Sequence, residues 1–393
     1  MIRIRTLDQL DFPSGARVFY RVDYNVPLEG TRITDATRIE ETLPTLRALR
    51  DRGAAIILAS HLGRPKGERK EKYSLRPVRE KLAELIGAEV QWADDCIGID
   101  TSNLQPGELL LVENLRFHAG EEKNDAQFAQ ELRKLADYYV NDAFGACHRA
   151  HASIDALPRL FAKENTAGGL LLARELEFLQ KVTNISERPF VALMGGAKIA
   201  GKIEPLEALV KLADKVLIGG GMANTFLAAR GVPMGGSLVD TDSIEVAQRI
   251  MEGDSRAEVI LPEDLVVADS LDHPTEIDEA EIIHGFTETE KAFDIGPLTI
   301  KRYETELKDA KLIFWNGPMG VFEKEQFAQG TMAMARAVAQ ADAVTVVGGG
   351  ESVEAVKASG FADRITHIST GGGASLEFIS GAALPGVEVL RMQ

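Results

Sequence analysis

The sequence predicts a two-domain α/β protein in which mainly parallel sheets carry helices on both faces, giving three layers in each domain. Short apolar, β-branched runs alternate with longer stretches of helical period, which is typical of strand–helix–strand units. At 393 residues, the chain is also longer than one typical core accommodates. The predicted strands are residues 18–22, 54–59, 109–112, 138–140, 190–194, 216–218, 259–261, 312–315 and 344–347.

Composition excludes several classes of function. The formal net charge of −16 argues against a general nucleic-acid or membrane binder, which needs a basic face. The two cysteines, Cys96 and Cys147, cannot build a disulfide framework and lack the paired spacing of a zinc site, so we expect buried thiols in a reducing compartment. Residues 1–10 interleave charged and apolar side chains, unlike a signal peptide, and no run approaches membrane-spanning length. We therefore expect a cytoplasmic protein.

The predicted strands of the first half end in basic, acidic and amide residues. Because the carboxyl ends of parallel strands meet at one edge of a sheet, these side chains should converge. Arginine binds carboxylates and phosphates through paired hydrogen bonds, so the cluster indicates a small, highly anionic ligand. A single arginine is more often part of a surface ion pair, and only the joint placement favours a site. The basic residues are Arg21, Arg38, His61, Arg64, Arg116, His148, Arg149 and His151.

Polar neighbours refine this anion site. Asp23 and Asn25 could hydrogen-bond to the hydroxyl groups of a sugar-acid phosphate. His61 and His151 could act as acid–base groups or as neutral donors that orient the ligand, and the sequence leaves both alternatives open.

The second half places a glycine turn and two lysines after the strand at 190–194. Gly195 and Gly196 allow a close approach to an anion, and we expect Lys198 and Lys202 on the first turns of the following helix. This pattern predicts a phosphate site, although an ordinary turn with two solvated lysines is an alternative. It is not a P-loop, because Ile203 stands where the magnesium-binding hydroxyl would be.

Three further glycine turns, at 219–221, 348–350 and 371–373, each follow a predicted strand or apolar segment. Each could present backbone amides to phosphates, and Glu351 could bind a magnesium ion directly or through water. The loop at 316–320, with Glu323, is suited to a ribose or base pocket. The dinucleotide fingerprint G-x-G-x-x-G is absent, which counts against a dehydrogenase. A basic site in one half and a glycine-rich phosphate site in the other suggest phosphoryl transfer.

A helix is predicted to connect the halves. Gly168 and Gly169 break the secondary structure, and Leu172, Leu176, Leu179 and Val182 then mark one face of a helix that runs toward Pro189. The expected organisation is a domain at 1–170, a connecting helix at 171–185 and a domain at 186–373. The alternative is a helix within one continuous sheet. We expect residues 66–72 to form a solvated loop and the acidic residues 269–290 to form an exposed surface segment.

Eight motifs, in this order, resemble those of the bacterial phosphoglycerate kinases over essentially the whole chain. They are 21–27 (RVDYNVP), 60–65 (SHLGRP), 113–117 (ENLRF), 141–145 (NDAFG), 148–151 (HRAH), 195–198 (GGAK), 315–323 (WNGPMGVFE) and 369–374 (STGGGA). The resemblance implies reversible phosphoryl transfer from 1,3-bisphosphoglycerate to ADP, giving 3-phosphoglycerate and MgATP in glycolysis.

The same resemblance implies residue roles. It assigns phosphoglycerate binding to Asp23, Tyr24, Asn25, Arg38, His61, Leu62, Gly63, Arg64, Arg116 and Arg149. It assigns nucleotide binding to Lys202, Gly317, Glu323, Gly349, Gly350, Glu351 and Ser352, with Glu351 facing the magnesium ion. The implied catalytic groups are Arg38 and Lys198, which would flank the transferred phosphoryl group, and the amides of Gly372 and Gly373.

The resemblance further implies two Rossmann-like domains that close on a hinge, a carboxyl tail at about 374–393 that packs on the first domain, and a monomer. Two positions depart from the family pattern. Glu351 replaces an aspartate, which moves the carboxylate by about 1.5 Å, and Gly201 replaces an aspartate before the second lysine of the turn. A catalytically silent binding protein on this scaffold, or a kinase acting on another small phosphorylated acid, are the alternatives.

Overall fold

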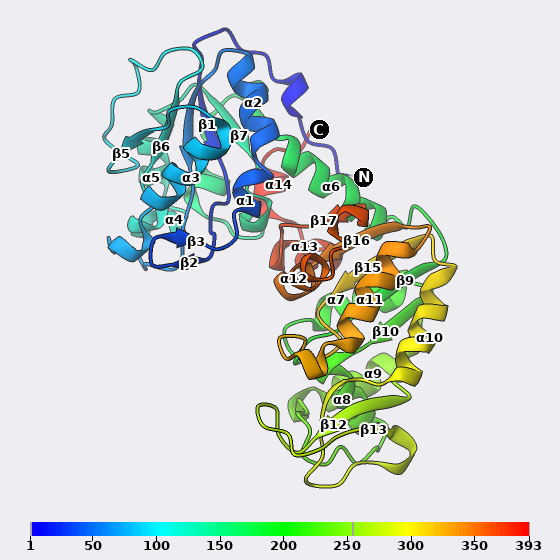
Figure 1. Cartoon of the computed structure of the whole chain (residues 1–393). Coiled ribbons are helices and arrows are strands. Elements are labelled where there is room, and N and C mark those ends of the chain that lie inside the picture. Colours follow the sequence, from blue (N-terminus) through cyan, green and yellow to red (C-terminus); the bar gives the residue numbers. More distant parts are fainter. Residues whose placement is uncertain (1, 254, 393) are drawn as a thin grey trace. The chain divides into compact units, whose positions relative to one another are not determined.

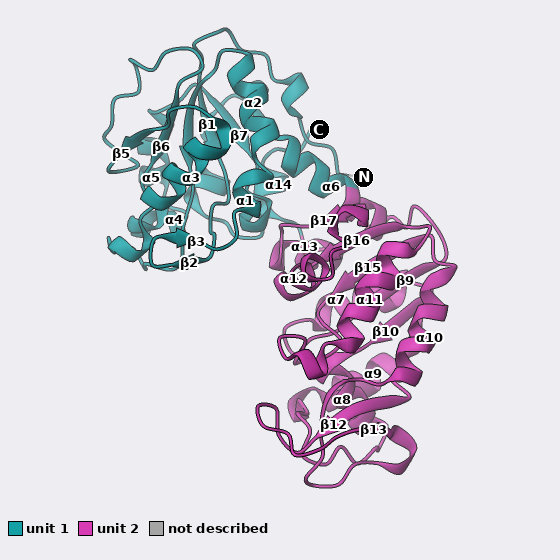
Figure 2. Ribbon diagram, viewed as in Figure 1, with its two compact units in different colours: residues 1–177, 383–393 teal, residues 178–382 magenta. Residues whose placement is uncertain are grey.

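The structure, a computed structural model, describes residues 2–253 and 255–392. Contacts between residues divide the chain into two compact units, coloured separately in Figure 2. Unit 1 comprises Met1–Glu177 and Ala383–Gln393, and unit 2 comprises Phe178–Ala382. In the part of the chain that the structure describes, no helix has the length and apolarity needed to cross a bilayer.

Unit 1 is built on a six-stranded parallel sheet with the strand order β5-β6-β4-β1-β7-β8. Figure 1 labels β1, β5, β6 and β7 of this sheet. Its centre is apolar because every residue of β4 and β6 is buried. The strands are β1 (Arg17–Arg21), β4 (Ala55–Ala59), β5 (Gln91–Ala93), β6 (Leu109–Val112), β7 (Tyr138–Asn141) and β8 (Thr166–Gly168), with a small hairpin of β2 (Leu28–Glu29) and β3 (Arg32–Ile33).

Helices connect these strands, as expected for crossovers between parallel strands. They are α1 (Thr37–Glu40), α2 (Leu43–Asp51), α3 (Arg76–Ile86), α4 (Ala119–Glu122) and α5 (Ala126–Arg133). The end of the chain returns to this unit through α14 (Pro385–Glu388), where the Gly386 amide donates to the Cys147 carbonyl at 3.0 Å. The expected tail began at about 374, whereas the contacts assign only 383–393 to unit 1.

Unit 2 has a second six-stranded parallel sheet with the order β11-β10-β9-β15-β16-β17. Its strands are β9 (Phe190–Met194), β10 (Lys215–Ile218), β11 (Glu258–Ile260), β15 (Leu312–Asn316), β16 (Val344–Gly348) and β17 (His367–Ile368). Its helices are α7 (Ile203–Leu212), α8 (Gly220–Ala229), α9 (Ile244–Glu252), α10 (Pro297–Lys308), α11 (Gln329–Gln340), α12 (Gly350–Ala358) and α13 (Gly373–Ile379). All nine strands predicted from the sequence are present, so the expected fold class is confirmed.

A three-stranded antiparallel sheet in unit 2 was not predicted. It pairs β12 (Asp264–Ala268) with β13 (Ile277–Glu281) and β14 (Lys291–Ile295). Residues 269–290 are largely exposed, as expected, but they include the whole of β13. The acidic sequence of β13 concealed it, because an edge strand exposed on both faces lacks the apolar alternation that identifies strands.

The predicted connecting helix is α6 (Leu170–Thr183), whose residues cross the boundary between the units. Its apolar stripe is buried at Leu172, Leu176, Leu179 and Val182. Asp142, which follows β7, anchors the start of α6 because its Oδ1 accepts the Leu172 amide at 2.9 Å.

Candidate active site

The basic residues of unit 1 gather where β1, β4 and β6 end. Arg38 donates from Nη1 to Asp23 Oδ2 at 2.5 Å, which ties α1 to the end of β1. Arg116 donates from Nη1 to the Gly63 carbonyl at 2.8 Å, and the Gly63 amide donates to Asn25 Oδ1 at 2.8 Å. These contacts bring together three segments that are distant in the sequence, as the parallel sheet predicted.

Buried Arg21 orients His61. Arg21 Nη2 lies 3.2 Å from His61 Nδ1, and a guanidinium can only donate, so Nδ1 accepts and the ring proton is on Nε2. The other side of Arg21 is held by Ser153 Oγ at 2.8 Å. Glu121, equally buried, lies 3.9 Å from Arg21 and accepts from the Ser153 amide at 2.9 Å. His61 is thus held as a donor whose Nε2 lies 3.9 Å from Asp23 Oδ1.

The electrostatics of this cluster favour an anionic ligand. Burial lowers the pKa of His61 well below its usual value, and Arg21, Arg116 and Arg38 lower it further despite the opposing effect of Asp23. Burial, followed by the charges of Arg116, Arg21 and Arg149, lowers the pKa of His151 to about 3. Both imidazoles are therefore neutral near pH 7, which favours orienting donors over the acid–base alternative.

Two buried nitrogen atoms in the cluster have no hydrogen-bond partner among the described residues. They are Arg116 Nε and His151 Nδ1. Buried polar groups are nearly always satisfied in folded proteins. Unsatisfied polar atoms beside several guanidinium groups are consistent with a ligand that supplies oxygen atoms.

The other predicted residues of this site differ in which of their atoms can contact a ligand. Tyr24 is fully buried and its hydroxyl lies 2.9 Å from Thr42 Oγ1, so only its backbone can meet a ligand. The Leu62 side chain is also buried, and its carbonyl accepts from Asn114. Arg64 and Arg149 are exposed, and Arg149 Nε donates to His148 Nε2 at 3.1 Å.

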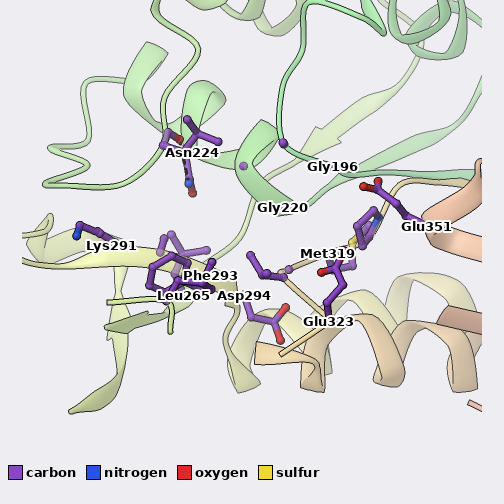
Figure 3. A pocket seen from close by; sticks show the side chains of 18 of the residues that line it. Gly196, Gly220, Asn224, Leu265, Lys291, Phe293, Asp294, Met319, Glu323 and Glu351 are labelled. Atoms are coloured by element: carbon purple, nitrogen blue, oxygen red, sulfur yellow. Dashed lines mark hydrogen bonds between the residues drawn. The ribbon is translucent and has the colours of Figure 1, made fainter. Parts of the chain in front are cut away.

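Unit 2 contains a pocket of about 500 Å³, shown in Figure 3. Gly196, Gly220 and Gly221 form part of its wall, while Met319 and Gly320 come from the loop after β15. Figure 3 shows the carboxylates of Glu323 and Glu351 on one side of the view and Lys291 on the other. Apolar, amide and charged groups thus surround a space within the range typical of small-molecule sites.

Glycines allow the loops around this pocket to approach one another. Gly317 has φ +93°, and a Cβ there would lie 2.2 Å from the Gly195 carbonyl oxygen. The Gly317 amide donates to Ser352 Oγ at 2.5 Å, which connects the loop after β15 to α12. Only glycine fits this backbone conformation and this spacing.

The predicted placement of both lysines on the first helical turns is wrong. Helix α7 begins at Ile203, so Lys202 is its N-cap residue and Lys198 lies in the preceding loop. Gly201, a residue of low helix propensity, lies between the two lysines. Lys202 Nζ donates to the Gly195 carbonyl at 2.9 Å, and burial lowers its pKa to about 8 despite the attraction of Glu351. Lys198 is exposed.

The remaining predicted nucleotide and catalytic residues lie at helix starts. Gly349 precedes α12, which begins with Gly350 and includes Glu351 and buried Ser352. Gly372 precedes Gly373, the first residue of α13. Apart from the adjoining residues and the backbone of the helix itself, no atom of the described residues lies within 4 Å of a Cβ built at either Gly350 or Gly372, so both positions border open space.

Sequence reasoning missed much of the pocket wall. Asn224 on α8, Leu265 on β12, and Phe293 and Asp294 on β14 all line the pocket. The antiparallel sheet that supplies three of them was overlooked. The apolar run at 265–268 was the available signal, since it follows the strand at 259–261 closely.

Asp294 gives the pocket a titratable group, and we expect it to make unit 2 less stable as pH rises from about 4 to 7. Burial raises the pKa of Asp294 to about 7, although the amides of Gly330 and Ile295 donate to its carboxylate. Since the folded pKa exceeds the unfolded value, the stabilising proton is present below pH 4 and is lost as pH rises through 7. The expected change is on the order of a few kcal/mol.

Urea unfolding of the parent and of Asp294→Asn between pH 4 and 8 measures this effect. A Trp92→Phe background leaves Trp315 as the fluorescence reporter in unit 2. Asp142 also has a raised pKa, of about 6, but its contribution cancels in the difference between parent and variant. The stability of Asp294→Asn relative to the parent should increase with pH, and a constant difference would contradict the prediction.

Comparisons with known proteins identify the family. A family model described as phosphoglycerate kinase matches residues 7–382. The phosphoglycerate kinase of Moorella thermoacetica is 50% identical over 98% of this chain and 98% of that protein. The solved phosphoglycerate kinase of Coxiella burnetii matches with a TM-score of 0.89 and 36% identity, and the match covers 99% of this chain and 99% of that chain. The solved phosphoglycerate kinase of Pyrococcus horikoshii matches with a TM-score of 0.86 and 32% identity, and the match covers 99% of this chain and 98% of that chain. The chain therefore belongs to the phosphoglycerate kinase family.

Proposed function

We propose that the basic cluster of unit 1 binds the phosphoglycerate and that the pocket of unit 2 binds ADP or ATP. The chain is a phosphotransferase of glycolysis that acts between 1,3-bisphosphoglycerate and ADP, giving 3-phosphoglycerate and ATP. The observation that supports the assignment most strongly is the cationic cluster of Arg21, Arg38 and Arg116 around neutral His61, in a chain with net charge −16. Such a cluster matches the charge of a phosphorylated acid.

In this proposal, direct in-line transfer moves a phosphoryl group between a carboxylate oxygen of 3-phosphoglycerate and the β-phosphate of ADP. Arg38 and Lys198 stabilise the charge on the transferred group, and the amides of Gly372 and Gly373 add donors. Transfer requires the two ligands to meet, so we propose that the units close on each other during the cycle and exclude water.

The residues at the pocket also suit a magnesium ion bound with the nucleotide. Glu351 is exposed, lines the pocket and makes no hydrogen bond or ion pair with any residue that the structure describes. Mg²⁺ is typically held by one or two carboxylates together with phosphate oxygens and water. We therefore propose that Glu351 holds the ion, which when bound neutralises the nucleotide's phosphate charge. We also propose a cytoplasmic monomer with small-molecule ligands and no nucleic-acid or membrane partner.

The nucleotide assignment predicts that Lys202→Ala weakens ADP binding by about 10- to 100-fold, because a charge-assisted hydrogen bond to phosphate is lost. Isothermal titration with MgADP and separately with 3-phosphoglycerate tests this. The affinity for 3-phosphoglycerate should be unchanged. Lys211→Ala, which removes an exposed lysine from the helix that Lys202 precedes, should bind both ligands like the parent. Equal losses for both lysine variants would overturn the assignment.

The metal assignment predicts that Glu351→Ala raises the magnesium concentration needed for half-maximal turnover by about 10-fold, since one charge-assisted contact is removed. A coupled assay with 3-phosphoglycerate and ATP, with and without EDTA, measures this. Glu351→Asp should remain close to the parent, and Glu354→Ala, an exposed carboxylate on the same helix, is the matched control. An unchanged magnesium requirement in Glu351→Ala would exclude this ligand. Binding of both substrates without any turnover by the parent would instead support the silent scaffold.

A further inference from the structure

A cluster of three side chains in unit 1 has the composition of a metal site and belongs to neither proposed ligand site. Asp95 and Cys96 follow β5, and His118 directly precedes α4. One carboxylate oxygen, the thiol sulfur and one imidazole nitrogen all lie within 4.8 Å of one another. Among the described residues, this is the one group of three or more Asp, Glu, His or Cys side chains with such spacing.

The surroundings hold these three groups in place. His118 Nε2 lies 2.6 Å from Asp95 Oδ1, and the same oxygen accepts the Cys96 amide at 2.7 Å. The His118 ring stacks on Phe128 with 5.2 Å between ring centroids. The ring stacking and the amide contact hold the His118 ring and the Asp95 carboxylate in place, whereas the contact between Nε2 and Oδ1 joins two atoms that could both bind an ion and would open around it. The cluster therefore needs only small adjustments to surround one ion.

The cluster is open on one side and carries negative charge. Cys96 is 1% exposed, whereas the side chains of Asp95 and His118 are 48% and 29% exposed, which gives an ion a path from solvent. The carboxylate of Asp95 lies beside the thiol sulfur, and negative charge there would favour a cation.

We propose that Asp95, Cys96 and His118 bind one thiophilic divalent cation of the Zn²⁺ class, with a fourth position open to solvent. Sulfur, nitrogen and carboxylate oxygen are the ligands that Zn²⁺ takes in tetrahedral sites, whereas Mg²⁺ prefers oxygen alone. On binding, the thiol releases its proton to solvent. His118 Nε2 faces the Asp95 carboxylate, which accepts, so Nε2 carries a proton in the metal-free chain. On binding, this proton exchanges with solvent, so that Nε2 binds the ion and the neutral ring carries its proton on Nδ1.

A cation bound at this site would restrict the motion of the segment that carries Arg116. His118 lies two residues beyond Arg116, and Glu121, which supports Arg21, lies three residues farther along. A cation that joins His118 to the loop after β5 would fix this segment. We therefore expect the bound cation to raise the Tm of unit 1 as well as to bind with a stoichiometry of one per chain.

Cobalt(II) titration of the full chain, after removal of metal and without nucleotide, tests the proposal. Thiolate ligation produces a sulfur-to-cobalt charge-transfer band in the near ultraviolet, which should saturate at one equivalent and disappear when Zn²⁺ is added. Cobalt bound at Glu351 cannot give this band, so the result is independent of the proposed nucleotide site. Absence of the band in the parent would overturn the proposal.

Variants identify the ligands. Cys96→Ser should abolish the band, whereas Cys147→Ser, which removes the other buried thiol, should retain it. His118→Gln and Asp95→Asn, which change partly exposed side chains, should each weaken cobalt affinity by at least about 10-fold. His284→Gln, at an exposed histidine of unit 2, should not. If Cys96→Ser fails to fold, unchanged affinity in the other two ligand variants would still overturn the proposal.

Discussion

Replacing Arg38 with alanine is expected to lower kcat by about 10³-fold, which is the loss expected when a guanidinium that stabilises a transferring phosphoryl group is removed. Nucleotide binding should change little, because Arg38 lies in unit 1 and the proposed nucleotide pocket is formed by unit 2. Steady-state kinetics with saturating 3-phosphoglycerate and MgATP, combined with titration of MgADP, separates the two effects. A kcat within a few-fold of the parent would refute the catalytic role.

Structural damage is the main competing explanation, because Arg38 also contacts Asp23 at 2.5 Å. Although burial raises the pKa of Asp23, the charges of Arg38 and Arg21 and the hydrogen bond from the Asn25 amide lower it overall, so Asp23 is ionised and would lose a partner. Arg32→Ala, which removes an exposed arginine from the same unit, provides the control for charge. Partial recovery of Arg38→Ala by added guanidinium ion would show that the missing group, and not a misfolded site, limits turnover.

Strand positions were predictable because the relevant signal is local. The apolar composition of a run such as Phe190–Met194 is enough to predict a buried strand, and β9 is fully buried. The connecting helix was predictable for the same reason, since Leu172, Leu176 and Leu179 repeat at helical spacing. Strand β13 was not, because its side chains are mostly exposed and its extended form depends on pairing with β12, which its own composition does not indicate.

In the candidate sites, too, the features that depend on local sequence were predictable and those that depend on distant contacts were not. Residues at strand ends, such as Asp23 and His61, follow apolar runs and could be located from them. The environment of each residue could not be read in this way. The sequence does not show that Arg21 fixes the tautomer of His61, because that depends on a contact between residues forty positions apart. Neither does it show that Asp294 lines the pocket.

The contact between Arg21 and His61 leads to the second large effect. Arg21→Met is expected to destabilise unit 1 by about 3–5 kcal/mol, because Arg21 and Glu121 are both fully buried and the carboxylate would lose its compensating charge. Substrate binding should weaken as well. Without the donor at Nδ1, the His61 ring is free to move its proton away from Nε2, the atom that faces Asp23.

Urea unfolding in a Trp315→Phe background, where Trp92 reports on unit 1, measures the stability change. Arg17→Met is the matched control, because Arg17 begins the same strand and pairs with Asp137 at 2.9 Å in a partly exposed position. That partly exposed pair should contribute at most about 1 kcal/mol. Similar losses of stability in the two variants would mean that burial of the Arg21 charge does not increase its contribution to the free energy of unfolding.

A double variant separates the buried charge from the orientation of His61. Arg21→Met combined with Glu121→Gln removes the uncompensated carboxylate, so it should recover about 1–3 kcal/mol relative to the sum of the single changes. It cannot restore the donor at His61 Nδ1. The KM for 3-phosphoglycerate should therefore remain raised in the double variant, and ¹⁵N chemical shifts of His61 should report a mixture of tautomers. Recovery of stability together with a parental KM would show that Arg21 only balances Glu121, whereas recovery of stability alone would establish Arg21 as a positioning residue for the phosphoglycerate site.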